Sequence, residues 1–294
     1  MFKAQQARIN SLAKSTRSSL ETHLRSFLYF CTYLSLTPFP VVSSTLTMYI
    51  QYLGENMRAP GTIKNYVFGL QTLSQLKEWS FPVLTNAMFR MQFKGIARSL
   101  AHTPKRATPM CPPTLVYLSQ FFDFTSSYEA SMWAVIVVGF FMFSRISNLL
   151  PPKKGWFDRN KQLLKSDVKV SSDSVIIVVK WSKVIQLSER QVTLPLKSIP
   201  GSPICPKTAL LNATRLAKSK DSDHLFSYRE NHVLSTITQS EFISFLRKKL
   251  KSSGLNPNLY SGHSLRRGGG CLLGISFWSS LGIDKTPRRL VIRQ

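Results

Sequence analysis

The first hundred residues repeat apolar positions at helical spacing. In the segment 17–36, RSSLETHLRSFLYFCTYLSL, apolar residues recur every three or four positions, and Ser18 or Ser19 can cap the start of the helix. Three further helices of the same type are predicted over 44–56, 59–79 and 84–100. Four short amphipathic helices predict a helical bundle that forms a domain over residues 1–101.

The composition then changes over 101–113, AHTPKRATPMCPP, which carries four prolines. Proline disrupts regular structure, so this stretch predicts a linker over 102–113. The alternative is an ordinary surface loop inside one domain. We take residues 114–294 as the second domain.

The second domain begins with helical patterns and then changes to strand patterns. The helix predicted over 128–150 is apolar nearly all round and therefore central, and a shorter helix precedes it over 114–124. Segments rich in Val and Ile predict a small antiparallel sheet from 163–170, 174–182 and 190–196, with 183–189 between the last two. Helices return over 207–219 and 239–254. The predicted fold class is mainly α with a small antiparallel β-sheet.

Charge adds a candidate partner to this picture. Lys and Arg number 39 against 14 Asp and Glu, for a formal net charge of +25. So basic a protein usually binds a polyanion, and nucleic acid is the first candidate. An anionic membrane surface and a purely solubilising charge excess are the alternatives.

Other function classes are disfavoured by the same composition. The carboxylates are scattered without metal-ligand spacing, and the four cysteines form no C-x-x-C pair, so we expect no metal site and no redox motif. The N-terminus has no apolar signal segment. The longest apolar run, 132–143, is about half a bilayer span, so it predicts a buried helix and no membrane crossing.

Two basic residues, Arg145 and Lys183, are candidates for binding an anion. Arg145 ends the apolar run, where it either pairs with a carboxylate or reaches solvent, or is held rigidly toward an anion. Lys183 lies where one predicted strand ends and the next begins. It is either a solvated hairpin lysine or a lysine on a loop that reaches a phosphate. Lys180 is the nearby alternative, inside the predicted strand.

A cluster of candidate residues lies in YSGHSLRRGGG, residues 260–270. His263 and Arg266 are three positions apart and share one face of a helix that Ser261 or Ser264 can cap. Histidine transfers protons near neutral pH, and arginine binds two phosphate oxygens at once. The glycines allow a close approach of backbone.

Arg145, Lys183, His263 and Arg266, in this order, resemble the active-site set of the tyrosine recombinases. The resemblance covers most of the chain, with TIKNYVFGLQTL similar to the family's core-binding domain. FMFSRISNL, WSKVIQ and SGHSLRRGG look most like the versions in eukaryotic mobile elements, the Crypton and DIRS-like groups. This resemblance implies a helical, SAM-like core-binding domain followed by an α+β catalytic domain.

The resemblance also implies a reaction on double-stranded DNA that needs no metal and no cofactor. Arg145 and Arg266 would stabilise charge on the scissile phosphate, and Lys183 would protonate the leaving 5′-oxygen. His263 would act in proton transfer. A tyrosine would form a covalent 3′-phosphotyrosine.

The sequence departs from the family pattern after the glycines. No tyrosine follows Tyr260, so the nucleophile is unknown, and Trp278 lies too close to Arg266 to match the family's later His or Trp. Tyr260 itself precedes the motif, where a packing role is expected. Asn148 stands where many members carry an acidic residue. A truncated, frameshifted or divergent C-terminal region is the expectation, and the chain is expected to be inactive.

Three functional hypotheses follow. The first is a recombinase-type DNA-binding protein that lacks its nucleophile. The second is a non-enzymatic, domesticated DNA-binding protein derived from a transposon recombinase, and the third is an unrelated RNA-binding protein. Related recombinases form tetramers on DNA by exchanging a C-terminal segment. We expect this chain to lack that segment and therefore to be a monomer when free, with a homo-oligomer possible on DNA. The resemblance implies a nuclear location.

Overall fold

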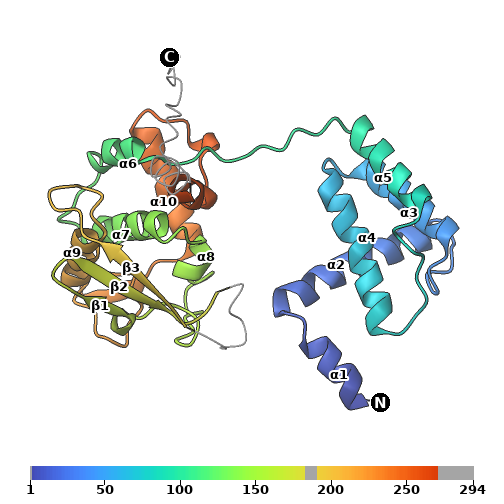
Figure 1. The fold of residues 1–294 in the computed structure, drawn as a ribbon, viewed down its shortest axis with the longest axis horizontal. Helices are drawn as coiled ribbons and strands as arrows, with labels where there is room; N and C mark the ends of the chain where they lie inside the picture. The colour runs from blue at the N-terminus through green and yellow to red at the C-terminus, as the bar shows by residue number, and fades with distance from the viewer. Residues whose placement is uncertain (1, 183–190, 271–294) are drawn as a thin grey trace, which may run out of the picture. The chain divides into compact units, whose positions relative to one another are not determined.

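The N-terminal helices form a unit with its own apolar core. The computed structural model describes residues 2–182 and 191–270, and the chain divides into two units, 1–105 and 106 onward. The helices of the first unit, in blue to cyan in Figure 1, are α1 (Phe2–Asn10), α2 (Lys14–Tyr33), α3 (Ser43–Asn56), α4 (Pro60–Leu76) and α5 (Ala87–Ser99). The four predicted helices are all present, and α1 was not predicted.

Aromatic side chains dominate the core of this unit. Phe27 and Phe30 of α2 are buried against Tyr49 of α3, with ring centroids 5.0 and 5.2 Å away. The Tyr49 hydroxyl meets its hydrogen-bonding need at the core edge by donating to Ser26 Oγ at 3.0 Å. Buried residues from α4 and α5, including Val67 and Phe89, close the same cluster.

The second unit combines helices with two small sheets. Its helices are α6 (Pro112–Ser119), α7 (Ser127–Phe141), α8 (Ile146–Leu149), η1 (Lys165–Asp167), α9 (Pro206–Ala217), α10 (Gln239–Ser252) and η2 (Pro257–Leu259). Its strands are β1 (Val168–Val170), β2 (Ser174–Val179), β3 (Val192–Lys197), β4 (Ser227–Glu230) and β5 (Val233–Thr236). A further helix covers residues 262–270. The predicted fold class is confirmed.

The predicted antiparallel sheet has the order β1-β2-β3. Val175 pairs with Val170 on one side and Leu196 on the other, while Ile177 pairs with Val168 and Leu194. Val175 and Ile177 are buried on one face, as the alternation of a half-buried strand requires. The β4–β5 hairpin was not predicted, because SYRE and VLST lack an apolar run.

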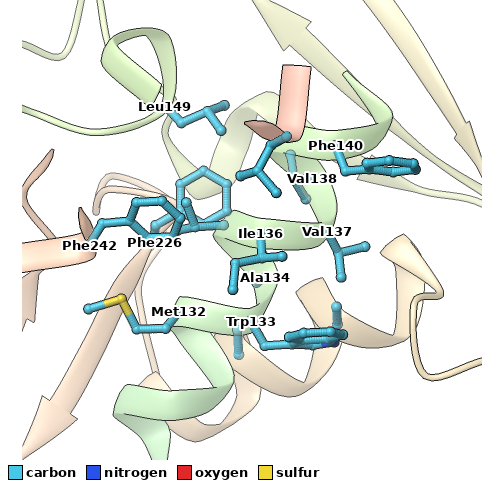
Figure 2. Close-up of a cluster of buried hydrophobic side chains, with 14 of the residues drawn as sticks. Met132, Trp133, Ala134, Ile136, Val137, Val138, Phe140, Leu149, Phe226 and Phe242 are labelled. Carbon is cyan, nitrogen blue, oxygen red and sulfur yellow. The ribbon is translucent and has the colours of Figure 1, made fainter. Parts of the chain in front are cut away.

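Helix α7 forms the centre of the second unit. Every residue from Ala130 to Phe140 is buried. Figure 2 shows Trp133 and Val137 on one side of the helix and Phe226 and Phe242 against another. A helix that buries its whole circumference organises the elements around it. The prediction that this segment is central is therefore correct.

The single helix predicted over 128–150 is instead two helices. Phe143 adopts a left-handed conformation, with φ of 48°. The Phe143 N–H donates to Phe140 O at 3.2 Å and the Ser144 N–H to Gly139 O at 3.1 Å, which is the Schellman pattern of a helix end. The apolar pattern continues across this turn, so periodicity alone predicted an unbroken helix.

The second half of the predicted linker segment is attached to the second unit. The Thr108 N–H donates to Leu259 O at 2.7 Å, and the Met110 N–H donates to Ser264 O at 3.0 Å. The Met110 side chain is fully buried. These contacts place residues 107–110 alongside the helix that carries His263 and Arg266.

Candidate functional site

The helix over 262–270 begins with a reciprocal cap. Ser261 Oγ accepts a hydrogen bond from the His263 N–H at 3.2 Å, and Ser264 Oγ accepts one from the Ser261 N–H at 2.9 Å. Ser264 is fully buried, whereas Ser261 is half-buried and His263 is exposed. Both serines that the sequence offered as alternatives take part. The cap fixes the first turn, which carries His263, and therefore the face on which Arg266 follows.

The glycines after Arg266 allow backbone to pack against backbone. A Cβ at Gly268 would overlap the Met110 carbonyl, with the Met110 carbonyl carbon at 2.7 Å. A Cβ at Gly269 would overlap the Phe140 carbonyl at the end of α7 and the ring of Phe143. A Cβ at Gly270 would meet no neighbouring atom within 4 Å. Two of the three glycines are thus required by close packing of the Arg266 helix.

Arg145 follows the turn that ends α7 and precedes α8. On its N-terminal side, the ring of Phe143 lies against Gly269. On its C-terminal side, Ile146 lies against Gly262, because a Cβ there would be 2.8 Å from Ile146 Cγ1. Arg145 therefore stands between two residues that both pack on the helix of His263 and Arg266. The structure brings these two predicted segments together.

The three predicted site residues in this part of the structure remain available to a ligand. Arg145 and Arg266 are half-buried and His263 is exposed. Within residues 2–182 and 191–270, no salt bridge reaches any of the three. The interpretation of Arg145 as the partner of a carboxylate is therefore not supported among the described residues. Unpaired guanidinium groups held by ordered backbone are suited to an anionic ligand.

The fourth predicted cation, Lys183, lies outside the described residues. Lys180, the alternative, directly follows β2 and is already engaged. Its Nζ is 2.7 Å from Asp167 Oδ2 and donates to Arg159 O at 3.0 Å. An amino group held by these two acceptors has a structural role.

A shallow hollow of about 510 Å³ borders the helix of His263. It is lined by Gln239, Ser240, Ile243, Ser244 and Arg247, all from α10. Ile243 also reaches Gly262, where a Cβ would be 3.4 Å from Ile243 Cδ1. Arg247 is exposed and adds a cation to this side of the site.

Tyr260 has the packing role that the sequence suggested. Its side chain lies against the core cluster of the second unit. Burial raises the pKa of the Tyr260 phenol. A phenol with a raised pKa is less easily converted to the phenolate that a nucleophile needs.

Neither a metal site nor a membrane-spanning helix is found among the described residues. No group of three His, Cys, Asp or Glu side chains among them is arranged to hold a metal ion. No helix in the described part of the chain is long and apolar enough to cross a membrane.

Sequence reasoning missed a buried histidine behind α8. His224 is 1% exposed and its Nδ1 accepts a hydrogen bond from the Phe226 N–H at 3.0 Å. Burial lowers the pKa of His224 to about 4, against the smaller, opposite influence of the backbone at Phe226 and Leu149. The folded protein therefore holds a neutral, buried imidazole near Leu149, the last residue of α8. A lone histidine in DSDHLF gave no pattern from which to predict this.

The fold is that of the tyrosine recombinases. One similar structure is the XerH site-specific recombinase bound to its difH substrate in a pre-cleavage complex. Its TM-score is 0.59 at 15% identity, over 90% of this chain and 70% of that one. The post-cleavage complex of XerH with a palindromic difH substrate gives a TM-score of 0.58 at 15% identity, over 91% of this chain and 73% of that one. No family model and no curated protein matches the sequence.

Proposed function

We propose that this protein binds double-stranded DNA in the manner of a tyrosine recombinase, with Arg145, His263 and Arg266 around one backbone phosphate. The observation that carries the proposal is the packing of the Arg145 segment on the helix of His263 and Arg266, with no carboxylate paired to these cations among the described residues. The similar XerH structures contain their DNA substrate, which supports the same partner here.

Each side chain would make a different contribution. The guanidinium groups of Arg145 and Arg266 would each donate two parallel hydrogen bonds from one planar fork to non-bridging phosphate oxygens, a geometry that a lysine ammonium does not offer. His263 would donate a hydrogen bond or transfer a proton at the same phosphate. Lys183, outside the described residues, completes the set in this proposal. Residues 1–101 would serve as the core-binding domain and residues 114–294 as the catalytic-type domain, joined by 102–113.

The net charge supports a polyanionic partner beyond this one phosphate. A protein with a formal charge of +25 releases many counterions when it covers a duplex, so its affinity falls steeply with salt. The proposed origin in a eukaryotic mobile element makes the nucleus its place of action. A free monomer that assembles only on DNA remains part of the proposal.

Binding to a mixed-sequence duplex at several salt concentrations tests the proposal. Arg266→Ala should weaken binding by about tenfold or more, because it removes charge-assisted hydrogen bonds to phosphate. The same change should lower the salt slope by about one. Arg215→Ala is the matched control, since Arg215 is exposed on α9 and donates to Asn212. Equal losses for the two variants, or tighter binding of structured RNA than of duplex DNA, would contradict the proposal.

A nicked suicide substrate tests whether the chain still cleaves DNA. We expect no covalent protein–DNA adduct on a denaturing gel, because no tyrosine follows Tyr260 in these 294 residues and Tyr260 packs against the core. DNA binding without an adduct would favour the alternative, a domesticated, non-enzymatic DNA-binding protein. An adduct that Tyr260→Phe abolishes would show instead that Tyr260 is the nucleophile.

A further inference from the structure

The loop from Pro151 to Lys161, PPKKGWFDRNK, presents an aromatic ring to solvent among cations. Trp156 is 59% exposed, and the loop's lysines and Arg159 are exposed beside it in the sequence. Leaving an indole in water forgoes the free energy of its burial. None of these residues takes part in the phosphate site proposed above. We call this segment the Trp156 loop.

The Trp156 loop is fixed to the body of the second unit at its start. Gln239 donates from its backbone N–H to Pro151 O at 3.0 Å and from its side chain to Leu150 O at 2.9 Å. Gln239 is the first residue of α10 and also lines the hollow beside the His263 helix. The start of the loop is therefore held by an element of the candidate site.

The middle and end of the loop are also fixed. The ring of Phe157 lies 5.3 Å from that of the buried His224. The Asp158 N–H donates to Gln162 Oε1 at 2.7 Å, and the Gln162 N–H donates back to Asp158 O at 2.9 Å. Arg159 O accepts the bond from Lys180 at the end of β2. The exposed tryptophan thus stands on an anchored segment.

A tight turn at the tip sets the position of the ring. The Trp156 N–H donates to Lys153 O at 3.2 Å, and Gly155 between them has a φ of 75°, which favours glycine. Lys153 Nζ lies 5.8 Å from the centroid of the Trp156 ring. The turn therefore holds a cation over the indole, while 59% of the Trp156 surface stays exposed.

These features match one kind of ligand. A nucleobase offers a flat apolar face for the indole, and the phosphates on either side of it offer anions for neighbouring lysines. Paired bases inside a duplex are already stacked on each other, so the indole can reach only an unpaired base. An anchored ring loses little freedom when it binds.

We propose that Trp156 stacks on an unpaired DNA base, with Lys153 and Lys154 on the adjacent phosphates. This inference rests on the proposed DNA-binding function and gives it a preference for DNA in which a base pair is open. A protein that handles DNA strands near a cut would use such a contact to hold a base out of the helix.

The test compares two DNA probes with the full-length chain. One probe is a fully paired duplex, and the other is the same duplex with a central bubble of mismatched bases. We expect the wild type to bind the bubble more tightly. Trp156→Ala should weaken binding to the bubble by about tenfold and to the paired duplex by no more than about twofold. Trp156→Phe, which retains an aromatic face, should keep most of the preference.

Two controls protect this interpretation. Trp79→Phe alters another partly exposed tryptophan, which lies against Phe39 in the first unit, and should leave the preference unchanged. Far-UV circular dichroism should show that Trp156→Ala folds as the wild type does, since the side chain lies on the surface. Quenching of indole fluorescence by the bubble probe should be reduced in the Trp156 variants.

The outcomes separate this inference from the proposed function. If the wild type binds paired duplex through Arg266 but Trp156→Ala affects both probes equally or neither, the stacking inference is wrong and the proposed function stands. If the wild type binds neither probe, both are wrong. If Trp156→Ala loses binding to vesicles containing phosphatidylserine but binds the bubble as the wild type does, the loop contacts a membrane surface and the inference is wrong.

Discussion

The segments that carry Arg145 and Arg266 are held in place by different means. The Arg266 helix begins with a cap formed by Ser261 and the buried Ser264, and two of its glycines pack against backbone carbonyls. Arg145 follows a turn in which Phe143, a bulky residue, adopts a left-handed conformation, and it precedes a helix of only four residues. The first segment is fixed by a local cap and by backbone contacts that only glycine permits, whereas the second is fixed by a helix-end turn and by side chains that pack around it. The Arg266 helix should therefore tolerate the fewest substitutions.

The largest expected effect is that of Gly268→Ala. Its new methyl group would overlap the Met110 carbonyl, and backbone on both sides leaves no flexible atom to move. We expect a loss of about 3 kcal/mol or more in the free energy of unfolding of the second unit. Urea unfolding followed by near-UV circular dichroism measures it.

Gly270→Ala is the matched control for this change. Gly270 is exposed, has open space around it and belongs to the same helix. Alanine there should stabilise the helix by up to about 1 kcal/mol. A similar loss for the two variants would show that the glycines serve helix flexibility and not close packing.

The second largest expected effect is a loss of stability of the second unit in acid. The pKa of His224 is lowered to about 4 in the folded protein from an ordinary 6.5, so between these values the unfolded chain binds a proton that the folded chain excludes. Stability should fall as the pH falls from 6.5 toward 4, by about 3 kcal/mol in total from this group. Urea unfolding at a series of pH values measures the slope.

His224→Asn should flatten this dependence. Its side-chain oxygen can still accept the Phe226 N–H, but it does not titrate. His102→Asn, at an exposed position before the second unit, should leave the slope unchanged. Burial also lowers the pKa of His23 in the first unit, so a slope that persists in His224→Asn would point to that histidine.

The smallest expected effect concerns the cap of the Arg266 helix. Ser261→Ala removes the acceptor for the His263 N–H and should cost about 1 kcal/mol. Ser252→Ala, at an exposed serine near the end of α10, should change stability by less than about 0.5 kcal/mol. Thermal unfolding of both variants compares them, and indistinguishable midpoints would mean that the cap does not stabilise the helix.

The sequence predicted elements wherever one pattern dominated locally. Helices α2 to α5 and the β1-β2-β3 sheet follow from helical spacing and from Val- and Ile-rich runs. The break at Phe143 was missed because it depends on tertiary contacts that offset a strained φ, and the β4–β5 hairpin because its strands are polar.

The candidate site was only partly predictable for the same reason. The spacing of His263 and Arg266 predicted that both lie on one helix, and Ser261 and Ser264 predicted its cap. The contact of Met110 with Gly268 and the burial of His224 join positions far apart in sequence. A single sequence contains no local pattern that indicates which distant residues will come into contact. The position of Lys183 in the fold stays a prediction.

The attachment of residues 107–110 to the Arg266 helix has a consequence for synthesis. Arg267 donates to Ala107 O across 160 residues of sequence. During translation the first unit can fold as soon as it emerges, whereas residues 107–110 must wait until the last helix of the described chain has left the ribosome. Contacts so distant in sequence form slowly. The proposed phosphate site would therefore be among the last parts of the newly made protein to form, after the core that supports it.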